Sequence, residues 1–188
     1  MSIDNLKARL DAVGHDDARD LKLNLSSVLT SSSLTTRQLW GAAVTAALAV
    51  RNEEVAAAIA AAARPQLTPE ELRAAETAAA VMAMNNVYYR SIHLLGGDYG
   101  KMPARLRMNA LAKPGVDKAD FELWSLAASA VNGCGMCLKA HEHEVLGKGL
   151  SKEAVQDALR IAATIHGVAA TLEGADAIAE AREPAAAA

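Results

Sequence analysis

Two cysteines and a histidine form the most reactive group of side chains in this 188-residue chain. Cys134, Cys137 and His141 are spaced three and four residues apart. Each interval is about one helical turn, so on a helix all three side chains lie on one face. A thiolate is both a nucleophile and a metal ligand, and two thiols one turn apart can close a disulfide. This spacing therefore indicates thiol redox chemistry or a metal site.

The cysteine pair is expected at the start of a helix, because Asn132 and Gly133 interrupt the helix that precedes it. The first backbone N–H groups of a helix have no partner within it, and with the helix dipole they stabilise a thiolate. Such a position lowers the pKa of a thiol from about 8.5 into the range of about 3.5 to 7.5. A useful fraction of thiolate is then present at neutral pH.

Two further residues can move protons at this site. His141 follows Cys137 by one turn, and an imidazole titrates near neutral pH, so His141 is the best general base in the sequence. Glu122 belongs to the preceding helix, which the Asn132-Gly133 break can fold back beside the cysteines. Its carboxylate could hold the second imidazole nitrogen or relay protons to solvent.

Other interpretations of these residues remain open at this point. A structural zinc site needs four ligands, whereas His143 points about 200° away from His141 on the helix. The same residues also fit inert buried thiols, a packing role for His141 and a solvated Glu122. We expect structural roles for His15, His93 and His166, and a core position for Met82 to Met84. The polar stretch Asn85 to Arg90 either lines the pocket or contacts another subunit.

The elements that position these residues are all helical, because no segment shows the period-two alternation of a strand. Thr35 with Gln38, and Thr68 with Glu71, each form a capping box at a helix start. We predict an all-α fold with helices over residues 2–13, 16–28, 35–50, 52–63, 69–94, 103–112, 118–131, 134 to 147 or 149, and 151–181. A single domain is expected over residues 1–183, followed by a disordered alanine tail over 184–188.

Two stretches of the sequence resemble each other at long range. Leu39-Trp40 matches Leu123-Trp124 at an offset of 84, and each pair opens an alanine-rich stretch. We therefore expect an internal duplication, with two similar helical halves over about 16–100 and 101–183. Chance similarity between alanine-rich helices would give the same match.

Composition excludes several classes of protein. The formal net charge is −3, which gives no electrostatic footprint for nucleic acid. No stretch reaches the roughly 18 apolar residues of a membrane span, and the first residues lack the apolar core of a secretory signal. We expect a cytoplasmic protein that binds neither nucleic acid nor membrane, in which a Cys-x-x-Cys pair is metal-binding or redox-active.

Together these residues resemble a known family. The pattern Glu-x11-Cys-x2-Cys-x3-His, with Phe-Glu-Leu-Trp-Ser around the glutamate and Ala-His-Glu-His at the end, is similar to the AhpD-type alkyl hydroperoxide reductases of the carboxymuconolactone decarboxylase superfamily. The similarity extends over nearly the whole chain and includes residues 20–27, 84–87 and 107–109. Some members have a histidine immediately before the second cysteine, where this chain has Met136.

The resemblance implies an AhpD-like helical fold, a homotrimer, and reduction of organic hydroperoxides by the cysteine pair. It implies that Glu122, Cys134, Cys137 and His141 are the redox and proton-relay residues. It also implies that the lipoyl group of a dihydrolipoamide acyltransferase, itself reduced by dihydrolipoamide dehydrogenase, re-reduces the pair, and that electrons can pass to the peroxiredoxin AhpC. No bound cofactor or metal is expected, and the lack of a Gly-rich nucleotide fingerprint means that electrons come from another protein.

The order in which the cysteines react is open to two arguments. The distance to His141 and the resemblance favour Cys137 as the peroxidatic residue and Cys134 as the resolving one, whereas the helix dipole alone favours Cys134. Two rival functions also remain: a carboxymuconolactone decarboxylase-like lyase, which would not need two cysteines, and a zinc-stabilised helical module.

Overall fold

The computed structural model describes residues 1–30 and 33–182, and over these residues it contains helices and no strand. The predicted all-α fold is thus confirmed. The elements are α1 (Ile3–Val13), α2 (Asp16–Val28), α3 (Thr36–Val50), α4 (Glu53–Ala63), α5 (Pro69–Leu95), the 3-10 helix η1 (Gly97–Lys101), α6 (Asn109–Ala112), α7 (Lys118–Val131), α8 (Gly135–Gly147) and α9 (Lys152–Arg182). The alanine tail predicted for 184–188 lies outside the described residues.

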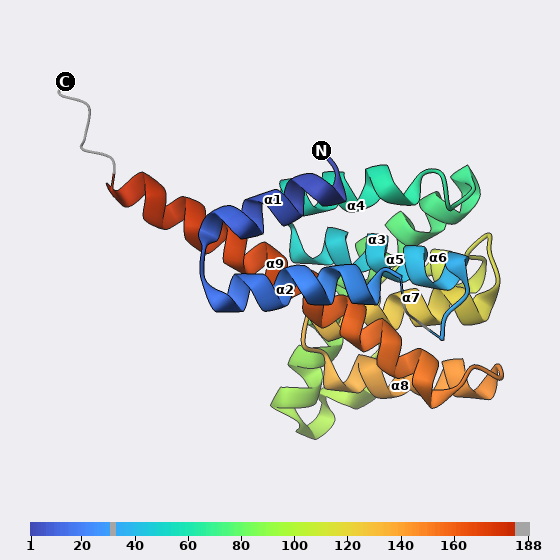
Figure 1. Ribbon diagram of the computed structural model, residues 1–188. Helices are drawn as coiled ribbons and strands as arrows, with labels where there is room; N and C mark the ends of the chain where they lie inside the picture. Colours follow the sequence, from blue (N-terminus) through green and yellow to red (C-terminus); the bar gives the residue numbers. More distant parts are fainter. Residues whose placement is uncertain (31–32, 183–188) are drawn as a thin grey trace.

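Helix α3 lies at the centre of the fold and packs against α4, α5, α7 and α9. Helices α1 and α2 lie side by side and pack on the long α9 (Figure 1). Helix α7 contacts α3 and α9 and also α5 and α8, which carry the candidate site. The predicted internal duplication and its two halves stay a prediction.

The close contact between α3 and α7 depends on Gly41. A Cβ atom at Gly41 would lie 2.0 Å from Cε2 of Trp124, far inside van der Waals contact. The Trp124 side chain is fully buried, and its Nε1 donates a hydrogen bond to the carbonyl oxygen of Gln38 at 3.2 Å. A residue without a side chain is therefore needed on α3 at this position.

A buried carboxylate also joins α3 to α7. Asp120 is 1% exposed, its Oδ2 lies 2.6 Å from Nε of Arg37, and its Oδ1 accepts a hydrogen bond from Nε2 of Gln38 at 2.8 Å. The negative charge of Asp120 raises the pKa of the Arg37 guanidinium above its ordinary value. Since a buried carboxylate without a partner is costly, this ion pair fixes how the two helices meet.

The helix starts follow the predicted caps. Thr35 accepts a hydrogen bond from the backbone of Gln38, and the Gln38 side chain accepts one from the backbone of Thr35. Thr68 and Glu71 exchange the same pair of hydrogen bonds, with Pro69 in the first helical position. Both capping boxes are therefore confirmed.

The helix predicted over residues 103–112 is wrong over its first six positions. The chain is irregular from 103 to 108, Arg105 has a left-handed φ of 51°, and only the short α6 follows. None of the residues from 102 to 112 is buried. A helix of this length needs packing against the core to be stable in water, and here Leu111, in the part that stays helical, is the one residue that packs against the hydrophobic core.

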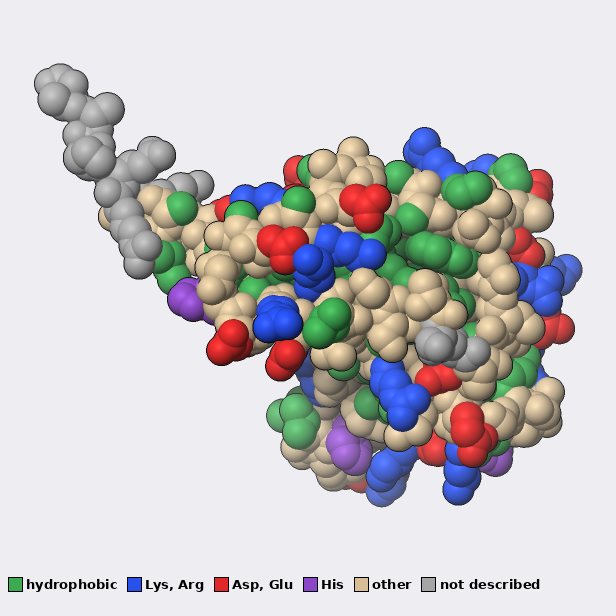
Figure 2. All heavy atoms as spheres, in the orientation of Figure 1, with side chains coloured by type: hydrophobic (Ala, Val, Ile, Leu, Met, Phe, Trp, Pro, Cys, Tyr) green, Lys and Arg blue, Asp and Glu red, His purple; other side chains and the backbone are tan. Residues whose placement is uncertain are grey.

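The surface carries charges of both signs. Figure 2 shows Lys and Arg side chains interspersed with Asp and Glu over one face, in keeping with the net charge of −3. Within the two described ranges, no helix is both long enough and apolar enough to cross a membrane.

Candidate active site

The turn between α7 and α8 brings the reactive residues together. Helix α7 ends at Val131, Gly133 takes a left-handed φ of 66°, and the backbone N–H of Cys134 donates to the carbonyl of Ser129 at 3.1 Å. The left-handed region suits glycine because it has no Cβ. The chain then reverses, so that α8 packs back against α7.

The two cysteines form a disulfide at the start of α8. Their Cα atoms lie 5.3 Å apart, and Cys134 is the N-cap residue of the helix. The backbone N–H of Cys137 donates to Sγ of Cys134 at 3.3 Å. The first-turn N–H group expected to stabilise a thiolate therefore points at the sulfur of Cys134.

The two sulfurs differ in their exposure. Cys134 is fully buried, whereas Cys137 is 7% exposed and lines a cavity. A small molecule that enters this cavity reaches Cys137 first, with Cys134 directly behind it in the disulfide.

His141 and Glu122 meet across α7 and α8, as the sequence predicted. Nδ1 of His141 lies 2.7 Å from Oε2 of Glu122, and both side chains are 13% exposed. Nε2 of His141 lies 3.3 Å from the sulfur of Met82, a buried residue of α5. In this disulfide form no hydrogen bond joins His141 to Cys137, although both line the same cavity.

The cavity beside Cys137 has a volume of about 220 Å³ and mostly apolar walls. It is lined by Met82, Asn85, Tyr89, Met108, Leu111, Met136, Cys137, Ala140 and His141. These residues come from α5, from the segment around α6 and from α8. Such a cavity fits a small ligand with an apolar body and holds a thiol and an imidazole at its wall.

A hydrogen-bond network supports the turn from behind. Asn86 is fully buried, and its Nδ2 donates to Oγ of Ser129 at 2.9 Å while its Oδ1 accepts from Nδ2 of Asn132 at 2.9 Å. Arg90 donates to the carbonyl of Asn132 at 2.6 Å. Helix α5 thereby holds the end of α7 and the first residue of the Asn132-Gly133 break.

Comparisons with known proteins show the family of the chain. The family model described as the carboxymuconolactone decarboxylase family matches residues 97–181. A protein named alkyl hydroperoxide reductase AhpD from Rhodospirillum centenum is 61% identical over 174 residues, which are 92% of this chain and 91% of that protein.

The chain belongs to the AhpD family. Other relatives with the same name come from Gluconacetobacter diazotrophicus, 56% identical over 178 residues (95% of this chain and 96% of the relative), and from Streptomyces coelicolor, 49% identical over 174 residues (92% and 96%).

The AhpD-type cavity contains residues beyond the redox and proton-relay residues named from the sequence. Met82, expected to be only a core residue, contacts His141 as well as being buried. Asn85 and Tyr89 line the cavity, which is one of the two roles expected for the stretch from Asn85 to Arg90. Met136, at the position where some AhpD proteins have histidine, is 42% exposed at the cavity wall.

The remaining histidines lie elsewhere. His15, His93, His143 and His166 are exposed, and none of them lines the cavity beside Cys137. Among the residues that the structure describes, no group of three or more His, Cys, Asp or Glu side chains is placed to hold a metal ion.

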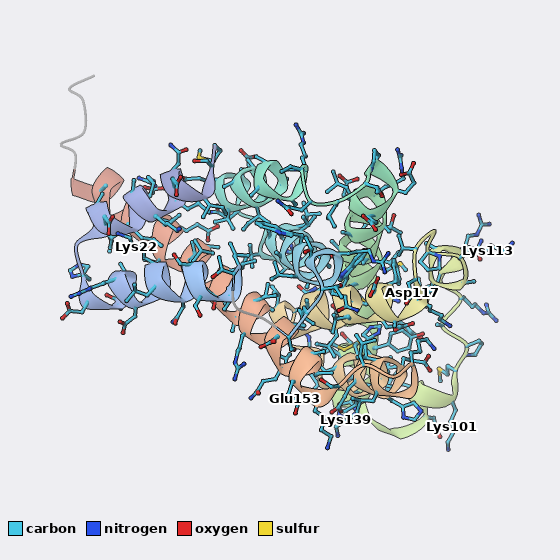
Figure 3. All side chains as sticks on the ribbon, turned by 45° about the vertical axis from the view of Figure 1, so that its right-hand side comes forward. Lys22, Lys101, Lys113, Asp117, Lys139 and Glu153 are labelled. Atoms are coloured by element: carbon cyan, nitrogen blue, oxygen red, sulfur yellow. A yellow bond between two sulfur atoms is a disulfide. The ribbon has the colours of Figure 1, made fainter. Side chains whose placement is uncertain are left out.

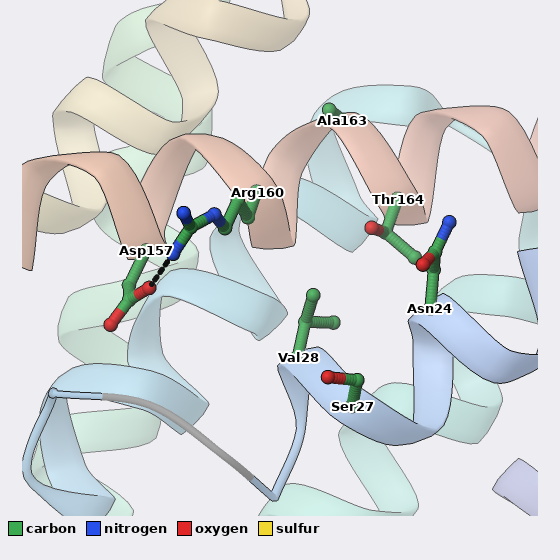
Figure 4. Close-up of a pocket in the computed structure, with 7 residues that line it drawn as sticks. All are labelled: Asn24, Ser27, Val28, Asp157, Arg160, Ala163 and Thr164. Carbon is green, nitrogen blue, oxygen red and sulfur yellow. Dashed lines mark hydrogen bonds and ion pairs between the residues drawn. The ribbon is translucent and has the colours of Figure 1, made fainter.

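A larger cavity of this AhpD chain, about 410 Å³, lies between α2 and α9 and is shown in Figure 4. Its polar residues include Asn24, Ser27 and Thr164, while Asp157 binds Arg160 at 2.8 Å and the backbone and hydroxyl of Ser33. It contains no thiol or imidazole. The smaller cavity is therefore the candidate active site.

Proposed function

We propose that this chain is a thiol-dependent hydroperoxide reductase in which Cys137 attacks the peroxide. The observation that carries this proposal is that Cys137 lines an apolar cavity together with His141, while Cys134 is buried directly behind it. The names of the relatives support peroxide reduction as the activity. The difference in burial supports Cys137 over Cys134 as the peroxidatic residue.

The proposed reaction has two steps. The thiolate of Cys137 attacks the terminal oxygen of the hydroperoxide, the O–O bond breaks, and the inner oxygen takes up a proton and leaves as an alcohol. Cys137 is then a sulfenic acid. The thiol of Cys134 attacks its sulfur, a disulfide forms, and the oxygen leaves as water.

His141 and Glu122 supply the proton transfers in this proposal. The Glu122 carboxylate orients the imidazole through Nδ1, at 2.7 Å, which leaves Nε2 directed toward the cavity side of α8 beside Met82. Nε2 takes the proton of the Cys137 thiol and returns it to the departing alkoxide. A water molecule or the substrate in the cavity can bridge the two groups.

A second dithiol must re-reduce the disulfide, and we propose that the lipoyl group of a dihydrolipoamide acyltransferase supplies it. Thiol–disulfide exchange with dihydrolipoyl restores both thiols, and dihydrolipoamide dehydrogenase then recycles the lipoyl group. The reduced pair can also pass electrons to the peroxiredoxin AhpC. In this proposal no cofactor is bound by the chain itself.

A group of basic residues on the surface fits the delivery of electrons by another protein. The segment over residues 101–113, which we name the basic segment, holds four Lys or Arg residues and no Asp or Glu, and it contributes Met108 and Leu111 to the cavity. Lys113 projects away from the fold (Figure 3), whereas Lys101 pairs with the exposed Asp98 at 2.8 Å. Since the chain as a whole is negatively charged, this segment favours a partner with an acidic face.

We also propose that the protein acts as a homotrimer in the cytoplasm. Several large apolar side chains of α5 are exposed, among them Val87, Leu94 and Leu95 at 53%, 77% and 65%. Burial of such side chains against further copies would stabilise an oligomer. The number three rests on the resemblance to the family.

The test is a reconstituted electron-transfer assay. Lipoylated acyltransferase, its dehydrogenase and NADH are mixed with the protein, and NADH loss is followed after an organic hydroperoxide is added, with and without AhpC. We expect NADH loss that requires the protein and both cysteines. If small dithiols support peroxide reduction but the lipoylated protein does not, the reductase activity stands and the lipoyl partner is wrong.

A lyase on the same fold is the second candidate, since the matching family model is described as carboxymuconolactone decarboxylase. A lyase needs no cysteine pair, so decarboxylation of a carboxymuconolactone that persists when Cys134 and Cys137 are both serine would favour it. Metal analysis of the purified protein tests the zinc-stabilised module, because about one zinc per chain would support it.

A further inference from the structure

The side-chain amide of Asn85 has no hydrogen-bond partner, and the fold does not require a polar side chain at this position. The residue lies on α5, is only 4% exposed, and its Oδ1 has no hydrogen-bond partner. No hydrogen bond joins its amide to any other described residue. A buried amide without a partner destabilises a folded protein, so such a residue is expected to have another purpose.

The next residue shows what a structural asparagine looks like here. Asn86 is fully buried, and both ends of its amide are hydrogen bonded, to Ser129 and to Asn132. The network that supports the α7–α8 turn is thus complete without Asn85. An apolar side chain at position 85 would serve the packing of α5 equally well or better.

A ligand in the cavity beside Cys137 would be a hydrogen-bond partner for the unsatisfied amide. Asn85 lines this cavity together with Cys137 and His141, and it is the one amide side chain among the described lining residues. The hydroxyl of Tyr89 lies against the sulfur of Met108 at 3.8 Å. Most of the remaining wall is apolar, so Asn85 and His141, with the Tyr89 hydroxyl as a further acceptor, are the groups able to orient a polar ligand atom.

The chemistry of an amide matches that of a hydroperoxide. An amide presents an N–H donor and a C=O acceptor on one edge, and a hydroperoxide presents an acceptor on its inner oxygen and a donor on its terminal oxygen. Since Oδ1 of Asn85 has no accessible surface, the N–H donor is the end of this amide that a ligand in the cavity can reach. An apolar cavity of about 220 Å³ accommodates the organic group.

We propose that Asn85 binds the hydroperoxide group of the substrate and orients it toward Cys137. This inference rests on the proposed function and adds the residue that recognises the substrate. Nδ2, the end of the amide that keeps accessible surface, donates a hydrogen bond to the inner oxygen.

The same arrangement assists the chemical step. As the S–O bond forms at the terminal oxygen, the O–O bond breaks and its electron pair moves to the inner oxygen. The Nδ2–H hydrogen bond strengthens as negative charge develops there. A proton from the His141 imidazolium completes the alcohol, and the terminal oxygen keeps its own proton as part of the Cys137 sulfenic acid.

Asn85→Leu tests this proposal, because leucine has a similar size and forms no hydrogen bond. Nuclear magnetic resonance titrations compare two ligands, benzyl alcohol and toluene, of which toluene is the matched probe that lacks the hydroxyl. Each ligand is added to the reduced wild-type protein and to the reduced Asn85→Leu variant. We expect the variant to bind benzyl alcohol about tenfold more weakly and to bind toluene at least as well. In the wild type, benzyl alcohol should shift the signal of the Asn85 side-chain amide.

Thermal unfolding and turnover complete the test. The melting temperature of Asn85→Leu should be equal to or above that of the wild type, whereas Asn86→Leu, which breaks the satisfied network, should lower it. The kcat/KM of Asn85→Leu for cumene hydroperoxide should fall about tenfold or more, with unchanged alkylation of Cys137 by iodoacetamide.

Three results would overturn the inference: equal weakening of both ligands or of neither, no shift of the Asn85 amide in the wild type, or a lowered melting temperature for Asn85→Leu. The binding comparison does not depend on turnover. A wild-type protein that fails to reduce peroxides therefore contradicts the proposed function, while the two ligands still report on Asn85.

Discussion

Nδ1 of His141 lies 2.7 Å from Oε2 of Glu122, although the two residues are 19 positions apart and on different helices. The contact depends on the turn at Gly133, which reverses the chain between α7 and α8. A carboxylate in this position fixes the orientation of the imidazole ring. His141 is thereby held at the wall of the cavity that Cys137 also lines.

The first prediction concerns this pair. His141→Gln should lower peroxide turnover by about 10²- to 10⁴-fold, because the general base is lost. Glu122→Gln should lower it less, since Glu122 acts through the imidazole. Stopped-flow kinetics of single turnovers with cumene hydroperoxide measure the rate for both variants, and circular dichroism checks that the helices persist.

Cys137→Ser is the matched reference for these two variants, because it removes the nucleophile itself. If His141→Gln and Glu122→Gln both turn over at the wild-type rate while Cys137→Ser is inactive, the start of α8 alone generates the thiolate. The relay assigned to Glu122 and His141 would then be wrong.

Gly41→Ala should destabilise the protein by about 1 to 3 kcal/mol, because the added Cβ would overlap the Trp124 indole. Gly174→Ala on α9 is the matched control, since nothing lies within 4 Å of its Cβ position. There the same change should stabilise the helix by about 0.5 to 1 kcal/mol. Urea unfolding of the two variants, with opposite signs expected, provides the measurement.

The basic segment should govern transfer from a protein partner but not from a small dithiol. The double variant Arg107→Glu with Lys113→Glu should raise the apparent KM for lipoylated acyltransferase and should leave reduction by free dihydrolipoamide unchanged. Arg19→Glu with Lys152→Glu changes the net charge equally at exposed positions outside the segment. An equal effect of the two double variants would show that the position of the charges is unimportant.

The oligomeric state should be a trimer. Light scattering is expected to give about three times the chain mass of 19.6 kDa at micromolar concentration, with or without dithiothreitol, because both cysteines pair within the chain. A monomer, or a species that dissociates on reduction, would contradict the proposed interface.

The sequence predicts most of the helices because their ends are marked locally. Capping boxes at Thr35 and Thr68, and the glycine at position 96, each act through hydrogen bonds or backbone freedom within a few residues. The prediction is wrong from 103 to 108 because the composition there permits a helix while none of these residues packs against the hydrophobic core.

The cysteines and His141 lie at the start of α8 or within it, and Glu122 lies on α7, the helix before the turn. Their spacing and the break between the two helices predict that they meet. Met82 and Asn85 come from α5, about 50 positions earlier, and no periodicity links them to Cys137. Their places follow from the packing of α5 against α7 and α8, which is a tertiary property. The polar stretch from Asn85 to Arg90 is the one feature of the sequence that indicates a role for α5 at the pocket.

The most direct test of this account is a single turnover with no partner protein. Fully reduced protein, freed of reductant, is mixed with an equimolar amount of cumene hydroperoxide, and the alcohol formed and the remaining thiols are counted by chromatography and mass spectrometry. The account predicts about one alcohol per chain, loss of both thiols and a mass lower by two hydrogens, with no alcohol formed by Cys137→Ser. Unreacted hydroperoxide with both thiols still open to alkylation would contradict it.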